Sequence, residues 1–287
     1  MSNTNLLIRP MQRAELDLLL DWAAQEGWNP GLHDANAFFA ADPEGFLIAL
    51  LNDTPVAAIS VVRYDDHYSF LGFYIVSPAY RGRGYGYQIW QAAVARMGQR
   101  AIGLDGVPDQ QENYRRSGFE LAHRNIRYEG RFRNGQWPAT HTAGLVPLSA
   151  VPFARVTDYD RAFFPATRGV FLRHWINQPD SASFGLCAED GSLSGWGLIR
   201  ACRNGWKIGP LFADTPTTAE TLFGALAATV TDETPIYLDV PQVNHAAVAM
   251  AESRGMTPVF ETARMYTRKP GDLALPRTFG ITTFELG

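Results

Sequence analysis

The feature that most constrains the fold is an internal repeat with an offset of about 138 residues. A strand-turn-strand pattern at 46–62 recurs at 184–200, with polar turns at Asp53-Thr54-Pro55 and Asp190-Gly191-Ser192. Turns of this chemistry between two apolar runs are typical of β-hairpins. The segments around each hairpin also follow in the same order in both halves. The sequence therefore predicts two α+β copies of one unit.

The length of 287 residues agrees with two domains of ~150 residues each. We expect domains at 1–135 and 153–287, joined by a linker at 136–152 that is rich in proline, threonine and glycine. Hydrophobic periodicity predicts the elements of both copies. In order, these are strand 5–9, helix 13–25, the first hairpin, strand 70–76, helix 85–99, strand 101–104 and a helix ending near Ser117, then helix 166–176, the second hairpin, strand 206–212, helix 217–230, strand 235–240, helix 244–254 and strand 259–266. Residues 269–287 are expected to dock through Phe279, Ile281 and Phe284.

Composition excludes several classes of function. The formal net charge of -4 argues against a general nucleic-acid binder, and no apolar run approaches the ~20 residues of a membrane helix. Residues 1–5 have no signal-peptide character, so we expect a cytoplasmic protein. Cys187 and Cys202 form no CxxC pattern and no histidine cluster exists, so no metal site is expected.

The strongest local signal is the glycine-rich segment 72–86. A strand ends at Val76, and Gly82, Gly84 and Gly86 stand directly before an amphipathic helix. Glycines let the backbone approach a ligand, and the free amides of a helix N-terminus attract an anion such as a pyrophosphate. A Walker loop is excluded because Gly-Lys-Ser/Thr is absent, and the GxGxG spacing does not fit a dinucleotide fingerprint. A turn without a ligand is the alternative interpretation.

This segment resembles the pyrophosphate loop of the GNAT (GCN5-related) N-acetyltransferase superfamily. Arg81-Gly82-Arg83-Gly84-Tyr85-Gly86 is similar to its R/Q-x-x-G-x-G/A pattern, and Val76-Ser77-Pro78 to the Val-x-Pro that often precedes it. The resemblance implies two tandem GNAT-like domains, each a mixed, mostly antiparallel sheet flanked by helices. It also implies acetyl-CoA as cosubstrate and no metal. The cofactor-binding residues that it implies are Ile75, Val76, Arg81, Gly82, Arg83, Gly84, Tyr85, Gly86 and Asn113.

Asn113 to Phe119 resembles the Tyr-x-x-x-Gly-Phe segment of the same family. The resemblance implies that Tyr114 lies near the coenzyme A sulfur and protonates the leaving thiolate, for which a phenol is a suitable acid. A tyrosine that only packs beneath the strand is the alternative. Val107 stands where many members have asparagine, so Gln110, Gln111 or Asn113 is expected to replace that contact with the pantetheine arm.

The second copy lacks the same features. Ala251 stands where the first copy has Tyr114, and the segment 213–218 has neither glycine nor arginine but carries Asp214. We therefore expect a degenerate copy that does not bind coenzyme A, and that is structural or helps to form the acceptor pocket. A second ligand site at Asp239 and Asn244 stays open.

The segment 22–42 between the first helix and the hairpin usually lines the acceptor pocket in the resembling family. Tryptophan beside carboxylates suits a cationic amine, and a histidine or carboxylate could act as base. The acceptor-binding candidates are Trp28, Asn29, His33 and Asp34. A turn at 29–31 and a helix cap at Asp34 are the alternative interpretations.

The sequence therefore predicts an acyl-CoA-dependent N-acetyltransferase that transfers acetyl directly to a small-molecule or protein amine. The alternative is a non-catalytic acyl-CoA-binding or regulatory protein. No nucleic acid or membrane partner is expected, and the chain is expected to be a monomer or a homodimer.

Overall fold

The computed structural model describes residues 6–132, 136–137, 143–231 and 233–287. The first half contains, in chain order, β1 (Leu6–Pro10), α1 (Glu15–Gln25), α2 (Asp34–Ala41), β2 (Phe46–Leu51), β3 (Thr54–Arg63), β4 (Tyr68–Val76), α3 (Tyr85–Met97), β5 (Ala101–Gly106), α4 (Gln111–Arg116) and β6 (Glu120–Arg131). The second half contains β7 (Leu145–Pro147), α5 (Phe153–Asp160), α6 (Gly169–Trp175), β8 (Ser181–Cys187), β9 (Leu193–Ala201), β10 (Trp206–Ala213), α7 (Pro216–Ala227), β11 (Pro235–Pro241), α8 (His245–Ser253), β12 (Thr257–Tyr266) and β13 (Thr278–Gly280). The predicted α+β class is confirmed.

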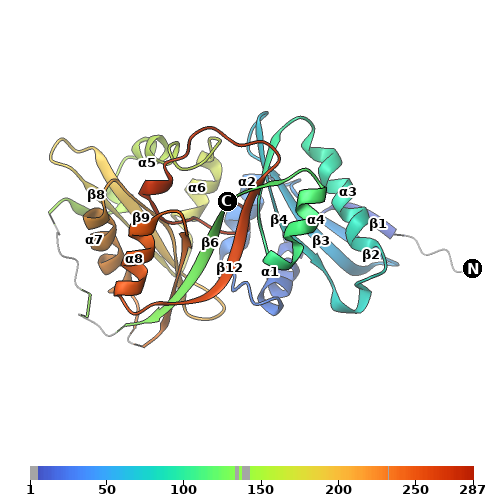
Figure 1. Ribbon diagram of the computed structural model, residues 1–287, viewed down its shortest axis with the longest axis horizontal. Helices are drawn as coiled ribbons and strands as arrows, with labels where there is room; N and C mark the ends of the chain where they lie inside the picture. Colours follow the sequence, from blue (N-terminus) through green and yellow to red (C-terminus); the bar gives the residue numbers. More distant parts are fainter. Residues whose placement is uncertain (1–5, 133–135, 138–142, 232) are drawn as a thin grey trace, which may run out of the picture.

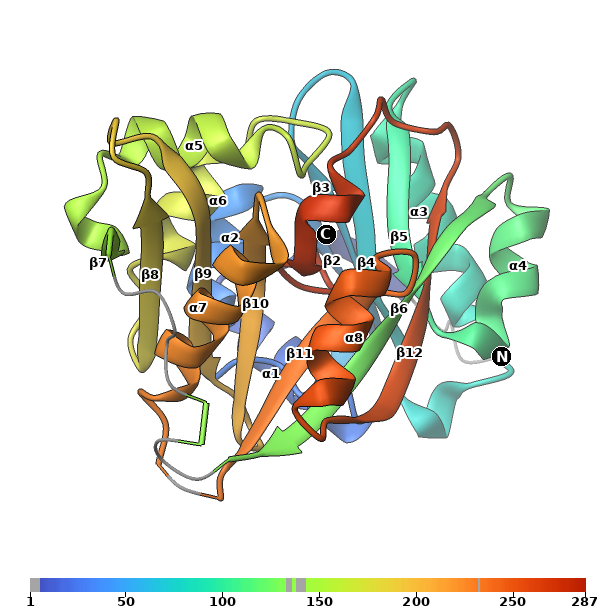
Figure 2. The ribbon, with the colours of Figure 1, turned by 60° about the vertical axis from the view of Figure 1, so that its left-hand side comes forward.

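One continuous sheet runs through both halves, in the order β1-β2-β3-β4-β5-β12-β6-β11-β10-β9-β8-β7, with β13 paired to β10 (Figure 2). Two neighbouring pairs of described strands are parallel, β4 with β5 and β10 with β11. These pairs are equivalent in the two copies. The rest of the sheet is antiparallel, so each copy has the mixed and mostly antiparallel sheet that was predicted.

The halves exchange their last long strands. β12 of the second half lies between β5 and β6, with Met265 opposite Leu104. β6 of the first half pairs in turn with β11, with Tyr237 opposite Glu129. Figure 1 shows β6 and β12 side by side at the centre of the molecule. The ranges 1–135 and 153–287 stay a prediction, and neither half has a complete sheet of its own.

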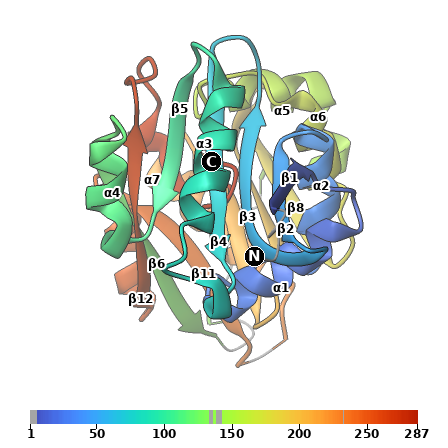
Figure 3. The same cartoon turned by 90° about the vertical axis from the view of Figure 1, so that its right-hand side faces the viewer.

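A central core joins the halves because helices of both contribute to it. α1 and α2 bury leucines, alanines and Phe38 against α6, where the rings of Phe38 and Trp175 stack at 5.9 Å. The outer faces are covered separately, by α3 over β2–β4 (Figure 3) and by α7 and α8 over the second half (Figure 2). Burial of this much apolar surface from both halves favours one folded unit.

The structure differs from the sequence interpretation at two places. α5 was not predicted, and part of the expected linker forms β7 on β8. Residues 138–142 of that linker lie outside the described residues. The expectation that the last segment docks is confirmed, since Phe279, Ile281 and Phe284 are buried.

Candidate active site

An opening between β4 and β5 positions the site. The two parallel strands pair from Tyr68 and Ala101 to Leu71 and Leu104, where the described register ends. The pairing of β4 with β3 shifts between Ala58 and Ser60, and Phe73 takes a φ of 49°. A bulge of this kind bends its strand and re-aims the side chains that follow. The end of β4 is thereby freed from β5, as ligand binding between the strands requires.

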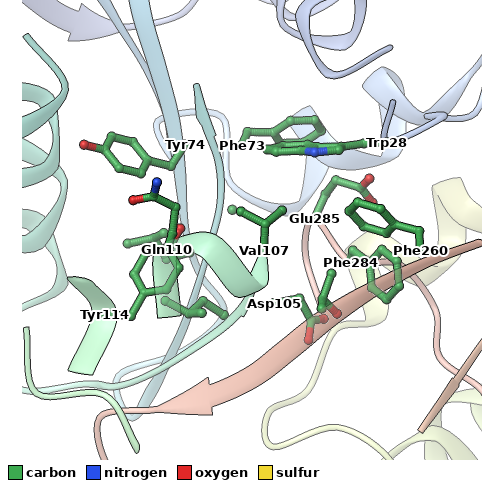
Figure 4. A pocket seen from close by; sticks show the side chains of 14 residues that line it. Trp28, Phe73, Tyr74, Asp105, Val107, Gln110, Tyr114, Phe260, Phe284 and Glu285 are labelled. Atoms are coloured by element: carbon green, nitrogen blue, oxygen red, sulfur yellow. The ribbon is translucent and has the colours of Figure 1, made fainter. Parts of the chain in front are cut away.

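A cavity of about 60 Å³ lies in this opening. Its walls are mainly apolar and aromatic, with two carboxylates. Figure 4 shows Tyr74, Gln110 and Tyr114 at one end of the cavity and Trp28, Phe260 and Glu285 at the other. The second half supplies Phe260, Thr262, Phe284 and Glu285. The cavity is therefore built by both halves.

A second cavity lies between α3 and α4, on the other side of the same wall. Trp90 and Asn113 line it from these helices, and it shares Tyr74, Gln110 and Tyr114 with the first cavity. These three shared residues mark the point where a ligand in one cavity would meet a ligand in the other.

The glycine loop lies at the start of α3. Gly82 and Gly84 have φ of 74° and 82°, a region that favours glycine, and Gly84 is the N-cap of this 13-residue helix. No atom lies within 4 Å of a Cβ built on either glycine, so the loop is open on its outer face. Open backbone at a helix N-terminus fits a pyrophosphate.

The other residues predicted to bind the cofactor lie in and around the glycine loop. Arg81 donates from Nε to the Val76 carbonyl at 2.9 Å and forms an ion pair with Glu26, while Arg83 is exposed. Ile75 is buried, Tyr85 packs edge-on to Tyr80, and Gly86 lies against the Tyr74 hydroxyl. Asn113 donates from its side chain to Gln110 at 2.8 Å. The residues predicted for the cofactor thus gather between the end of β4, the start of α3 and α4.

Tyr114 is buried beside Trp90, with ring centroids 5.7 Å apart. Burial, and to a smaller extent Tyr74, raises the pKa of Tyr114. Burial also raises the pKa of Tyr74. Both phenols therefore carry their proton at neutral pH. The sequence interpretation missed Tyr74, although its place in the strand before the loop was the available signal.

Of the four predicted acceptor residues, Trp28 alone lines the cavity. Asn29 exchanges two hydrogen bonds with Asn204, at 2.8 and 2.9 Å, and His33 Nε2 lies 2.8 Å from Asp180 Oδ2. Asp34 is fully buried and accepts from Arg200 Nε and from the Gly31 amide, both at 2.8 Å. These three residues do not line the cavity and instead contact residues of the second half, so their assignment to the acceptor stays a prediction.

The equivalent site of the second half is filled by the chain itself. β13 pairs with β10 at Leu211 and Phe212, and Ile281 donates to the Asp239 carbonyl of β11 at 2.9 Å. The helix start is also occupied, since Thr215 accepts from the Thr218 amide at 3.2 Å and Asp214 pairs with Arg277.

The contacts of Asp239 and Asn244 do not support a second ligand site at these residues. Asp239 is buried, and Arg127 donates to both of its oxygens at 2.6 and 2.8 Å. Although burial opposes ionisation, this arginine lowers the pKa of Asp239. Asn244 donates to backbone carbonyls of the segment that leads into β13, including that of Thr278 at 2.9 Å. Both side chains are thus engaged within the protein.

No group of three or more potential metal ligands occurs among the described residues. Among the residues that the structure describes, no helix is both long enough and apolar enough to cross a bilayer.

Comparisons with known proteins agree with this geometry. Two family models match, "Acetyltransferase (GNAT) family" at residues 13–119 and "Acetyltransferase (GNAT) domain" at 156–274. A holothin acyltransferase from Pseudoalteromonas sp. (strain SANK 73390) is 32% identical over 279 residues, which cover 97% of this chain and 94% of the relative.

Two solved structures share the fold. A Pyrococcus horikoshii protein, whose assignment as an acetyltransferase is itself provisional, is 22% identical with a TM-score of 0.82, and the match covers 100% of this chain and 99% of the other. A tandem GNAT protein from the clavulanic acid biosynthesis pathway is 14% identical with a TM-score of 0.67, over 91% and 98% of the two chains. At these identities the likeness supports the fold alone. Together with the relative that matches over nearly its whole length, these findings show that the chain belongs to the GNAT acyltransferase superfamily and carries two GNAT domains in tandem.

Proposed function

We propose that this protein is an acyl-CoA-dependent N-acetyltransferase whose single working site lies in the first half. The observation that carries the proposal is the meeting of two cavities at Tyr74, Gln110 and Tyr114, where β4 and β5 diverge. One cavity is lined by Tyr87 and Trp90 of α3, the helix that follows the glycine loop, and suits the cofactor. The other is enclosed by both halves and suits the acceptor.

Acetyl-CoA supplies an activated acetyl thioester when it is bound. The amides at the start of α3 and the loop around Gly84 hold its pyrophosphate, with Arg81 and Arg83 as the nearby cations. Arg81 exchanges its ion pair with Glu26 for a phosphate oxygen. Ile75, Val76 and Asn113 border the path of the pantetheine arm. Backbone amides near Ile75 and Val76 polarise the reacting carbonyl.

Tyr114 protonates the leaving sulfur, because it is buried at the junction of the two cavities. Transfer is direct, with both substrates held at this junction, so proximity and orientation supply much of the rate.

The acceptor is a small primary amine with a flat, apolar body. Trp28, Phe73 and Phe260 form aromatic walls, and carboxylates face the same cavity. Aromatic faces beside negative charge suit a cationic or heteroaromatic amine. The curated relative is named a holothin acyltransferase, which supports acyl transfer by this chain.

The second half does not bind coenzyme A, because β13 and the cap at Thr215 occupy the equivalent place. It acts by completing the sheet and the acceptor cavity. We place the reaction in the cytoplasm, carried out by a monomer or homodimer without nucleic acid or membrane partners.

The test is calorimetric titration of acetyl-CoA into the wild-type protein and the Gly84→Asp variant. We expect one site per chain, lost in Gly84→Asp because the new carboxylate meets the phosphates. Gly255→Asp is the matched control, since Gly255 has a φ of 72° and equally open surroundings but lies in the second half. Absence of wild-type binding, or two sites per chain, would refute the proposal. Binding followed by no acetylation of any amine would favour a non-catalytic acyl-CoA-binding protein.

A further inference from the structure

The segment 278–287 reaches the acceptor cavity by passing between the halves. After pairing with β10 it crosses two glycines, where the backbone carbonyls of the segment come very close. A Cβ built on Gly209 would lie 2.5 Å from the Thr282 carbonyl oxygen, and one built on Gly72 would lie 2.1 Å from that of Glu285. Only glycine permits these approaches, so β4 and β10 are shaped to receive the segment.

Side chains of both halves hold this segment in place. Tyr64 of the first half donates to the Leu286 carbonyl at 2.9 Å. Arg168 of the second half donates to the Gly287 carbonyl and to the Thr282 hydroxyl, both at 2.9 Å, while Asp160 fixes the same guanidinium. Leu286 is fully buried. The backbone on both sides of Glu285 is therefore firmly positioned.

The Glu285 side chain points into the acceptor cavity, as Figure 4 shows. It is 3% exposed, and Thr283 donates its hydroxyl proton to Oε2. Oε1 is buried without a hydrogen-bond partner among the described residues. Buried carboxylate oxygens are normally hydrogen-bonded, so an unpartnered one that faces a cavity marks a place for a donor from a ligand.

The other carboxylate of the cavity is already engaged. Asp105 accepts from Arg264 at 2.8 and 2.6 Å and from Asn125 at 2.8 Å. Glu285, in contrast, interacts electrostatically with Arg127, Arg200 and Lys207, and the two arginines are each paired with an aspartate of their own. Of the two cavity acids, Glu285 is the one with an oxygen that accepts no hydrogen bond from the described residues.

We propose that Glu285 is the general base of the reaction, a catalytic residue contributed to the first-half site by the last segment of the second half. This inference rests on the proposed function. The nitrogen of the neutral amine bonds to the thioester carbonyl carbon and gives one proton to Glu285 Oε1. The carbon–sulfur bond breaks, and sulfur takes the proton of Tyr114. The products are the amide and the free thiol. Glu285 then releases its proton to solvent, and Tyr114 takes one proton from solvent.

The test compares wild type with Glu285→Gln, using acetyl-CoA and two arylalkyl amines, 2-phenylethylamine and tryptamine, with thiol release as the signal. We expect kcat to fall about 10²- to 10⁴-fold in Glu285→Gln. The affinity for acetyl-CoA, measured by titration, stays within about twofold. Glu261→Gln is the matched control, because Glu261 is half-exposed on β12 and pairs with Arg124 outside the cavity.

A second variant separates chemistry from folding. In Glu285→Ala, added formate should restore part of the turnover, because a small carboxylate can enter the space left by the side chain. Rescue by formate supports a base, since a purely structural loss would not respond to it. Normal turnover by Glu285→Gln, or a low rate that formate does not raise in Glu285→Ala, would overturn the assignment while the proposed function stands. A wild-type protein that acetylates neither amine would overturn both.

Discussion

Asp34 gives the sharpest test of how the two halves are joined. Its carboxylate is fully buried and pairs with Arg200, whose guanidinium also lies 4.3 Å from the centre of the Trp175 ring. Asp34→Asn keeps the shape but leaves the arginine charge buried without its counter-ion. Breaking a buried pair in this way costs about 3–5 kcal/mol of the free energy of unfolding. With an m-value of about 3 kcal/mol/M, the urea midpoint should fall by about 1–2 M.

The assay is urea unfolding followed by tryptophan fluorescence, with Asp180→Asn as control. Asp180 pairs with His33 across the same boundary but is 62% exposed, so its loss should cost about 0.5 kcal/mol or less. Replacing both partners, as Asp34→Leu with Arg200→Met, should recover much of the loss because no charge stays buried. An unchanged midpoint for Asp34→Asn, together with a raised KM for the amine, would refute this reasoning and restore Asp34 as an acceptor residue.

Two further predictions concern pH and the close approach at Gly72. Burial, with a smaller effect from Arg264, lowers the pKa of His123 to about 3. Because the folded pKa lies below the ordinary value of about 6.5, this stabilisation is complete above pH 6.5 and is lost as the pH falls toward 3. Between pH 7.5 and 5 the wild type should lose on the order of 2 kcal/mol more than His123→Leu in urea titrations, and equal losses would contradict the assignment. Gly72→Ala would place a Cβ 2.1 Å from the Glu285 carbonyl oxygen and displace the segment. We expect kcat to fall about tenfold or more with unchanged acetyl-CoA affinity, and full activity would count against a role for the segment.

Much of the first-half site could be predicted because its signals are local. The glycine loop requires a positive φ at Gly82 and Gly84 directly before a helix. The glycines that allow it stand close together in the sequence, so the loop can be recognised there. Tyr114 is implied by the resemblance of 113–119 to the Tyr-x-x-x-Gly-Phe segment of the family. The repeat could be predicted for the same reason, since hairpins and amphipathic helices produce periodic hydrophobic patterns over short stretches of sequence.

The strand exchange could not be predicted in this way. Alternation along β6 and β12 indicates which face of each strand is buried but not which strand lies beside it. The ion pair of Asp34 could not be predicted for a related reason. An acidic residue in a predicted helix start looks like a cap or a binding group, and only the fold brings Arg200 to it from 166 residues away. Tyr74 and Glu285 join the site through the bulge in β4 and the path of the last segment, which are likewise tertiary features.

The same ten residues at 278–287 account for the asymmetry between the two copies. Their first part lies in the opening between β10 and β11, the place that corresponds to the proposed cofactor cleft of the first half. Their last part completes the wall of the first-half cavity with Phe284 and Glu285. The path of this one segment thus fills the opening in the second half and adds side chains to the cavity of the first half. Because β6 and β12 are also exchanged, the second half is needed for the site itself as well as for stability.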